Sequence, residues 1–268
     1  MAETNIHPTA IVEDGATVAD GVSIGPFSVV GRDVTLGEGV VLHSHAVVAG
    51  RTTIGARTEI FPFASIGHKP QDLKYKGEAS TLTIGTDCMI REGVTINPGT
   101  EGGGMTTTVG NGCAFLANSH VGHDCHVGNN VIFSNNVMLA GHVEVGDFAI
   151  LGGGAAVIQF ARVGDHAFLG GMSGLEQDLI PYGMALGNRA YLSGLNIVGL
   201  KRRGFSASQI HDLRRAYRLL FAAEGTLLER VDDVADEFRD HPTVMEIIAF
   251  IRAGGKRSMC TPKNAADA

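Results

Sequence analysis

The fold is decided by a six-residue repeat, which is clearest in residues 121–151: VGHDCHVGNNVIFSNNVMLAGHVEVGDFAIL. From Val121 to Leu151, every sixth residue of this stretch is a large apolar one. Neither an α-helix nor a single strand keeps a period of six, because their side chains repeat about every 3.6 and every two residues. A repeat of this kind is typical of a parallel β-helix, in which each hexad forms a short strand and a corner.

The same repeat extends outward over most of the first two thirds of the chain. It runs without a miss from Ile6 to Ile66, resumes from Ile84 to Ile96, and runs again from Val109 to Leu169. Two residues before almost every apolar anchor stands a small or β-branched residue, which suits a side chain that points into a tight corner. The sequence therefore predicts a mainly β protein in which three hexads make one triangular coil.

Two interruptions and a change of period predict the domain organisation. The hexads break at about residues 67–82 and 98–108, where we expect loops inserted at corners. From about Ser206 the apolar residues follow helical spacing, and three segments open with a possible capping box: Ser206 with Gln209, Thr226 with Glu229, and Thr243 with Glu246. We expect a β-helix with two loops over residues 1–186 and a C-terminal helical domain over 187–268, with a loose tail after about residue 254.

Composition excludes several classes of protein. The net charge of −7 argues against a nucleic-acid partner. The segment Met1–Asn5 lacks the basic start and apolar core of a signal peptide, and no apolar run is long enough for a transmembrane helix, so we expect a cytoplasmic protein. Cys88, Cys113 and Cys125 fall on the small corner position, which predicts buried thiols.

The residues most able to do chemistry are in the segment 118–126, NSHVGHDCH. With Val121 as the inward anchor, the phase of the repeat directs His120, His123 and Asp124 outward. Residues 18 apart stack on adjacent coils, so His142 lies over Asp124. Three interpretations compete at this point: a general base of a transferase, a zinc site of His120, His123 and His142 as in β-helical carbonic anhydrases, or a solvated face of a structural solenoid. The polar loop at 67–82 favours the transferase.

Several motifs together resemble one family, the acyl-[acyl-carrier-protein]–UDP-N-acetylglucosamine O-acyltransferases of lipid A and lipopolysaccharide biosynthesis. They are the hexad array, Gln71 to Tyr75, Asn118 to Cys125, Leu139 to Val143, Gln159-Phe160, Pro181-Tyr182, and Asn196 with Gly199 to Phe205. The resemblance covers about residues 6–250 in order. It implies a left-handed coil, a homotrimer with active sites between subunits, and transfer of a 3-hydroxyacyl chain from acyl carrier protein to the 3-position of UDP-N-acetylglucosamine.

The resemblance also implies roles for individual residues. His123 is the general base, Asp124 supports its imidazole, and the backbone N–H of Gly141 stabilises the oxyanion. The implied substrate contacts are Asp72, Lys74, His120, His142 and Gln159 for the sugar and phosphates, Asn196 and Arg203 for uridine, and Arg202 for the carrier arm. Gly171 is the implied limit of the acyl groove, with bulky Phe168 as the alternative ruler. No metal or redox cofactor is expected, because a thioester needs only deprotonation of its attacker and oxyanion stabilisation.

Four positions depart from the pattern that many members share, and they keep alternatives open. Asn97 and Ile158 stand where many members have His, Pro98 where many have a basic residue, and Val198 where many have Glu. These positions lie near the nucleotide sugar in the family. A 3-amino sugar nucleotide, acylated to an amide, is therefore an alternative acceptor. The related UDP-glucosamine N-acyltransferase and the zinc enzyme are further alternatives.

Overall fold

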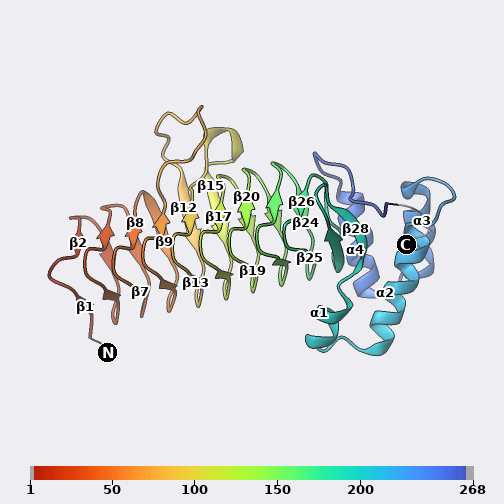
Figure 1. Cartoon of the computed structure of the whole chain (residues 1–268), viewed down its shortest axis with the longest axis horizontal. Helices are drawn as coiled ribbons and strands as arrows, with labels where there is room; N and C mark the ends of the chain where they lie inside the picture. Colours follow the sequence, from red (N-terminus) through yellow and green to blue (C-terminus); the bar gives the residue numbers. More distant parts are fainter. Residues whose placement is uncertain (1–2, 264–268) are drawn as a thin grey trace.

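The hexads coil into a three-sided, left-handed parallel β-helix, which confirms the predicted fold (Figure 1). The computed structural model describes residues 3–263. We call the three faces sheets A, B and C. Sheet A contains β1 (Asn5–Ile6), β4 (Ser23–Ile24), β7 (Val41–Leu42), β10 (Glu59–Ile60), β13 (Met89–Ile90), β16 (Ala114–Phe115), β19 (Ile132–Phe133), β22 (Ile150–Leu151), β25 (Phe168–Leu169), β27 (Gly183–Leu186) and β28 (Tyr191–Leu195).

The other two faces are built in the same way. Sheet B contains β2 (Ile11–Val12), β5 (Val29–Val30), β8 (Val47–Val48), β11 (Ser65–Ile66), β14 (Thr95–Ile96), β17 (His120–Val121), β20 (Met138–Leu139), β23 (Ala156–Val157) and β26 (Gly174–Leu175). Sheet C contains β3 (Thr17–Val18), β6 (Thr35–Leu36), β9 (Arg51–Ile54), β12 (Thr81–Ile84), β15 (Thr106–Val109), β18 (His126–Val127), β21 (Glu144–Val145) and β24 (Arg162–Val163).

The apolar anchors form the core of the prism. From Ile24 onward they are almost completely buried, while Ile6 at the open N-terminal end is 44% exposed. Parallel pairing keeps each anchor above its counterpart on the neighbouring coil, as Val121 pairs with Leu139 in β17 and β20. The repeat continues one hexad beyond the predicted end, because Leu175 in β26 is also buried.

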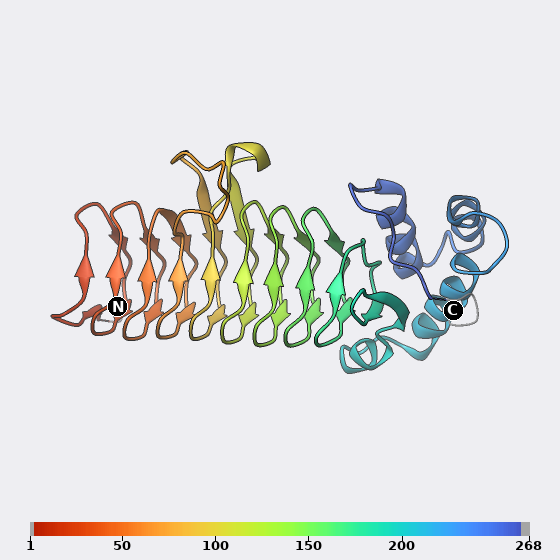
Figure 2. The same ribbon diagram turned by 45° about the horizontal axis from the view of Figure 1, so that its top comes forward.

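The three edges of the prism are the A/B, B/C and C/A corners, named after the sheets that they join. Most coils place a residue with positive φ at each corner, three positions before the next anchor. This left-handed conformation is accepted by residues other than Gly here, including Asp124 (φ 58°) and His142 (φ 62°) at the B/C corner. Both inserted loops leave this same corner, and they project side by side from one edge of the prism (Figures 1 and 2). The second contains the 3₁₀ turn η1 (Glu101–Gly103).

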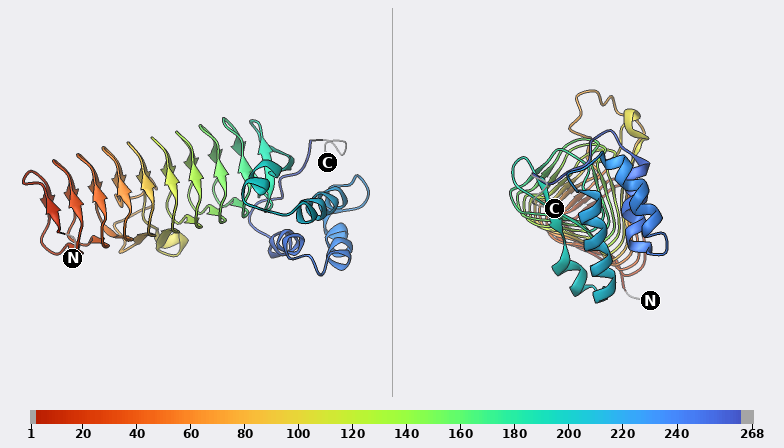
Figure 3. Two further views of the ribbon diagram at one scale, coloured as in Figure 1. Left: turned by 90° about the horizontal axis from the view of Figure 1, so that it is seen from below. Right: turned by 90° about the vertical axis from the view of Figure 1, so that its right-hand side faces the viewer.

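Four helices follow the strands: α1 (Ile197–Arg202), α2 (Ala207–Leu220), α3 (Leu227–Glu237) and α4 (Pro242–Ala253). The last three pack together at one end of the β-helix (Figure 3). Two of the predicted capping boxes form, at Ser206 and Thr226. The third is wrong, because α4 begins at Pro242, one residue before Thr243, with His241 as its N-cap. Glu246 instead accepts a hydrogen bond from the Tyr182 hydroxyl on the β-helix.

The boundary between the two predicted domains remains a prediction. Strand β28 lies beyond residue 186, yet it pairs with β27 and extends sheet A. The expectation of a loose tail after about residue 254 is wrong for the segment that ends at Thr261. Its backbone pairs with Asp178 and Leu192, and Cys260 is buried. Residues 264–268 of that predicted tail lie outside the described residues.

Two further expectations concern the whole described chain. The four cysteines are free and buried, as the corner positions of three of them predict. Among residues 3–263, none of the helices is both long and apolar enough to cross a membrane.

Candidate active site

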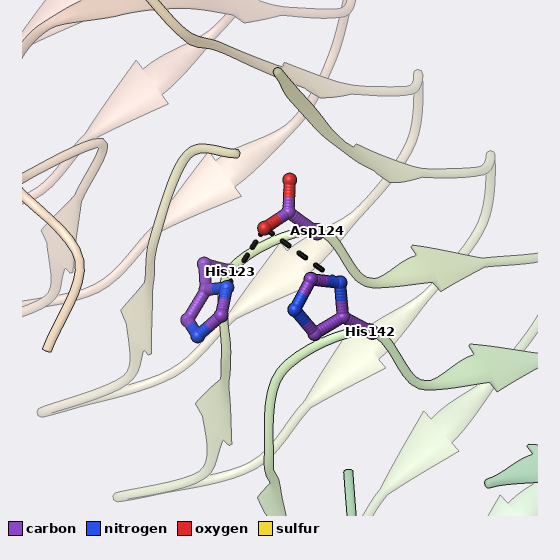
Figure 4. Close-up of side chains that lie close together, drawn as sticks. All are labelled: His123, Asp124 and His142. Atoms are coloured by element: carbon purple, nitrogen blue, oxygen red, sulfur yellow. Dashed lines mark hydrogen bonds and ion pairs between the residues drawn. The ribbon is translucent and has the colours of Figure 1, made fainter. Parts of the chain in front are cut away.

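The B/C corner brings together two imidazoles and a carboxylate (Figure 4). His123 Nδ1 lies 2.8 Å from Asp124 Oδ2, and His142 Nδ1 lies 3.9 Å from the same oxygen. The rings of His123 and His142 meet edge to face, with centroids 4.9 Å apart. The side chains of His123 and His142 are 12% and 19% exposed, so both imidazoles remain open to a ligand.

Asp124 points away from the core as the repeat predicts, but the second inserted loop covers it completely. Its side chain is fully buried, and its carboxylate accepts hydrogen bonds from the backbone N–H (2.8 Å) and hydroxyl (2.6 Å) of Thr100. The backbone N–H of Asp124 donates to Thr107 Oγ1. Hydrogen bonds to the charged form offset the cost of burying a carboxylate, and they fix its position beside His123.

Two glycines allow these close approaches. A Cβ at Gly103 would overlap the carboxyl group of Asp124, and a Cβ at Gly141 would lie 2.5 Å from His123 Cε1. By contrast, a Cβ at Gly102 would meet nothing within 4 Å. At Gly103 the second loop, and at Gly141 the neighbouring coil, therefore contact the His123–Asp124 pair through backbone alone.

On its other side, His142 stacks on an aromatic ring. Phe160, 18 residues along at the same corner, lies parallel to His142 with centroids 4.4 Å apart. Burial lowers the pKa of His142, so its imidazole is neutral at pH 7. A neutral imidazole accepts or donates one hydrogen bond at each nitrogen, which suits a substrate contact.

The two loops and the B/C corner enclose a cavity of about 730 Å³ within a single chain. Asp72 and Lys74 from the first loop, Thr100 from the second, and His142 and Phe160 from the β-helix all line it. This cavity is large enough for part of a sugar nucleotide. The structure therefore gathers three of the predicted substrate-binding residues, Asp72, Lys74 and His142, in one place.

Two other predicted residues lie close to this group. His120 is on the face of sheet B, with its Nδ1 2.7 Å from Thr95 Oγ1, and burial lowers its pKa. Gln159 precedes Phe160 at the B/C corner, and its backbone carbonyl accepts a hydrogen bond from Arg257.

The remaining predicted residues lie on the other two corners. Asn196 caps α1 and donates to the carbonyl of His166, while Arg203 donates to the carbonyl of Phe148, and both contacts are at the C/A corner. Arg202 is exposed near them. The candidate rulers are at sheet A and the A/B corner, where Phe168 is half-buried in β25 and Gly171 is exposed. One chain alone does not bring these groups to His123.

His123, Asp124 and His142 also form a group that could hold a metal ion, although His120 of the predicted zinc set is not part of it. Asp124 Oδ2 already accepts from the Thr100 hydroxyl and faces His123 Nδ1. A metal ion would have to displace His123 from this oxygen. The geometry therefore fits a hydrogen-bonded His–Asp pair better than a metal centre.

The sequence reasoning missed Thr100, Gly103 and Lys256. Lys256 lies over the face of Phe160, with its Nζ 4.0 Å from the ring centroid. The hexad gives no register for residues in a loop or a tail, so periodicity could not place them. The second loop's Gly and Thr content was the only available signal.

Comparisons with known proteins agree on a family. A model of bacterial transferase hexapeptides (six repeats) matches residues 106–141, and a model of domain 2 of UDP-N-acetylglucosamine O-acyltransferase matches residues 178–260. The chain is 73% identical to the acyl-[acyl-carrier-protein]–UDP-N-acetylglucosamine O-acyltransferase of Methylobacterium radiotolerans, over 98% of this chain and 97% of that one. Identity to the Brucella ovis enzyme of the same name is 50%, over 98% and 94%.

Solved structures give the same result. The UDP-N-acetylglucosamine acyltransferase of Francisella novicida superposes with a TM-score of 0.94 at 34% identity, covering 98% of this chain and 96% of that one. The UDP-N-acetylglucosamine O-acyltransferase of Moraxella catarrhalis gives 0.93 at 40% identity, covering 95% and 99%.

Proposed function

The chain belongs to the acyl-[acyl-carrier-protein]–UDP-N-acetylglucosamine O-acyltransferase family, and we propose that its B/C corner is where the acyl transfer takes place. The enzyme moves a 3-hydroxyacyl chain from acyl carrier protein to the 3-position of UDP-N-acetylglucosamine, which is the first step of lipid A biosynthesis. The observation that carries the placement is the 2.8 Å contact between His123 and the buried carboxylate of Asp124.

His123 acts as the general base. Its Nδ1–H donates to Asp124, which fixes the tautomer that leaves Nε2 free to accept a proton. Nε2 takes the proton of the sugar 3-hydroxyl as the oxygen attacks the thioester carbonyl. When the tetrahedral intermediate collapses, the C–S bond breaks and the thiol of the carrier arm leaves with the proton from His123. Asp124 stabilises the imidazolium that exists between these two steps.

The backbone N–H of Gly141 suits the oxyanion of the intermediate. Gly141 faces the ring of His123, and its N–H donates to no acceptor among the described residues. A free backbone donor beside the base stabilises negative charge on the thioester oxygen as it develops.

The loop cavity holds the acceptor. Lys74 supplies a cation for the diphosphate, and Asp72 and His142 supply hydrogen-bonding groups for the sugar. His120 and Gln159 extend this surface along sheet B and the B/C corner. We assign the acyl ruler to Gly171, with Phe168 as its alternative.

A homotrimer accounts for the residues that one chain leaves apart. Asn196, Arg202 and Arg203 lie at the C/A corner and Gly171 at the A/B corner, so only a neighbouring chain can bring them to His123. Sedimentation should give a trimer, and an active monomer would contradict this. Mixing His123→Ala with Arg203→Ala subunits should restore part of the activity that each variant lacks, provided that a site takes these residues from two chains.

The experiment that tests the function is identification of the product by mass. The protein is incubated with UDP-N-acetylglucosamine and a panel of 3-hydroxyacyl carrier protein thioesters. We expect an ester at the sugar 3-position and release of the carrier thiol. Failure to acylate this sugar nucleotide with any donor would overturn the proposal.

A second acceptor is favoured by one observation, which concerns Asn97. Its Oδ1 is buried and has no hydrogen-bond partner among the described residues, and the residue pairs with the coil that contains Val121. Asn97 stands where many members of the family have His, so the hydrogen-bonding groups at this position differ from theirs. The 3-amino analogue therefore belongs in the same assay, where an amide product made in preference to the ester would establish it.

Two further expectations remain proposals. The enzyme works in the cytoplasm, where nucleotide sugars and acyl carrier protein thioesters are made. Its chemistry requires no metal ion, and activity that survives exhaustive chelation, together with metal analysis of the purified protein, tests this.

A further inference from the structure

The C-terminal segment places a lysine beside the candidate active site. After α4 the chain turns back toward the β-helix on the side from which the two loops project (Figures 1 and 2). Lys256 Nζ lies 4.0 Å from the centroid of Phe160, whose other neighbour in the stack is His142. The series His123, His142, Phe160 and Lys256 thus extends along the B/C corner from the general base to an ammonium group.

The segment that carries Lys256 is fixed by its own contacts. Arg257 Nε donates to the carbonyl of Gln159 at 2.9 Å, one residue before Phe160. The carbonyl of Ser258 accepts from Asp178, and the N–H of Cys260 donates to Asp178, both at 2.8 Å. Cys260 is fully buried. The chain that directly follows Lys256 is therefore held on the β-helix by the Arg257 side chain and by backbone pairing of residues 258–260.

The charge of Lys256 is available to a ligand. Lys256 takes part in none of the ion pairs among residues 3–263, and its side chain is exposed. The Phe160 ring occupies one side of the ammonium group, which carries three N–H donors. The remaining donors can bind an anion that enters from solvent.

A second cavity lies between Lys256 and His142. It has a volume of about 480 Å³ and is lined by Asp124 and His142 on one side and by Gly255 and Lys256 on the other. The charge of Lys256 also affects the pKa of His142. Burial is the main cause of the lowered pKa of His142, and the positive charge of Lys256 contributes in the same direction.

We propose that Lys256 is a substrate-binding residue, which receives a phosphate group of one of the two substrates at the B/C corner. This assignment rests on the proposed function. Both substrates carry phosphate, as the diphosphate of the sugar nucleotide or as the phosphodiester of the carrier arm. A lysine ammonium binds phosphate as a point charge and requires no fixed orientation. Lys256 can therefore bind phosphate while it also lies over the Phe160 ring.

Kinetics of three variants test the proposal. Lys256→Met removes the charge and keeps the length, Lys256→Arg keeps the charge, and Lys263→Met is the matched control. Lys263 belongs to the same segment and lies over the ring of Tyr191 at 4.5 Å, so it makes a similar contact far from the B/C corner. The values of kcat and of KM for each substrate are measured separately, together with the melting temperature.

We expect Lys256→Met to raise KM for one substrate roughly 10- to 100-fold, the range of a lost charged hydrogen bond, with little change in kcat. Lys256→Arg should recover most of this loss, and Lys263→Met should leave both KM values within about twofold. A raised KM for the sugar nucleotide assigns the diphosphate, and a raised KM for the acyl carrier protein thioester assigns the carrier arm. Unchanged KM values for Lys256→Met, or an equal effect from Lys263→Met, would overturn the proposal.

Direct binding separates this proposal from the proposed function. UDP and 4′-phosphopantetheine are titrated into the wild type and Lys256→Met, without any need for turnover. Weaker binding of one of them to the variant supports the proposal even if the acceptor sugar has been assigned wrongly. Equal binding of both ligands to the two proteins contradicts it, whatever the activity of the wild type.

Discussion

The A/B and B/C corners use the same backbone and the same pair of residue types with different results. At the A/B corner His45 (φ 61°) stacks on Phe63, and at the B/C corner His142 (φ 62°) stacks on Phe160. His45 and Phe63 are exposed, whereas His142 lies 3.9 Å from the buried carboxylate of Asp124. The repeat determines where a corner side chain points, and the inserted loops determine what it can do there.

The largest effect should come from Asp124, the buried carboxylate that pairs with His123 at the B/C corner. Asp124→Asn should lower kcat by about 10³-fold or more, because an amide no longer holds the protonated Nδ1 of His123 or stabilises the imidazolium. The measurement is kcat with both substrates saturating, and the melting temperature shows whether the variant is folded. A loss of less than about tenfold in a folded variant would mean that the buried carboxylate is structural.

The next test concerns the loop that covers Asp124. Gly103→Ala introduces a Cβ that overlaps the Asp124 carboxyl, so η1 must shift and kcat should fall roughly 10²-fold, as for a displacement of about 1 Å in an active site. Gly102→Ala is the matched control, because its Cβ meets nothing within 4 Å. Turnover of the two variants is compared under identical conditions. Equal activities would show that close packing of this loop is unimportant.

A smaller effect is expected at the C/A corner, which has no inserted loop and whose His166 forms none of the ion pairs among the described residues. Arg202 is exposed in the last turn of α1, next to Lys201 and Arg203. Arg202→Glu should raise KM for the acidic acyl carrier protein roughly tenfold and weaken its salt dependence, with kcat almost unchanged. A short pantetheine thioester is the control donor. An equal loss with that donor would show that Arg202 does not recognise the carrier protein.

The smallest effect on total activity is expected at the A/B corner. Gly171 is exposed, and a Cβ there would lie 3.2 Å from the carbonyl oxygen of Gly153, so a larger side chain needs only a small adjustment. Gly171→Met should shift the preference toward shorter acyl donors, by about tenfold or more per methylene that no longer fits, while the best donor reacts nearly as before. Competition between donors of different length measures this. An unchanged preference would assign the ruler to Phe168.

The sequence was sufficient to predict the fold, because a six-residue repeat is typical of a parallel β-helix and of few other folds. It predicted the anchors, the corners, the stacking of His142 over Asp124, and the N-caps at Ser206 and Thr226. It did not predict the burial of Asp124. That burial depends on the path of the second loop, and a Gly-rich loop has no periodic pattern from which its path follows.

The C-terminal errors have a similar physical cause. The capping box at Thr243 is absent because Pro242 occupies the first helical position, where proline's fixed φ and missing N–H are favourable. The segment around Lys256 looks like a tail by composition, yet tertiary pairing with Asp178 holds it on the β-helix. Contacts between residues so far apart in the chain cannot be recognised from local sequence.

The most direct test of the account is the turnover of His123→Ala compared with that of His45→Ala, both at a corner of the same prism. With UDP-N-acetylglucosamine and a 3-hydroxyacyl carrier protein thioester, His123→Ala should lose about 10²- to 10⁴-fold in kcat, the usual range for a general base. His45→Ala should keep wild-type turnover, and both melting temperatures should stay close to the wild-type value. A His123→Ala variant that retains most of its activity would contradict the account and make His142 the first candidate for the base.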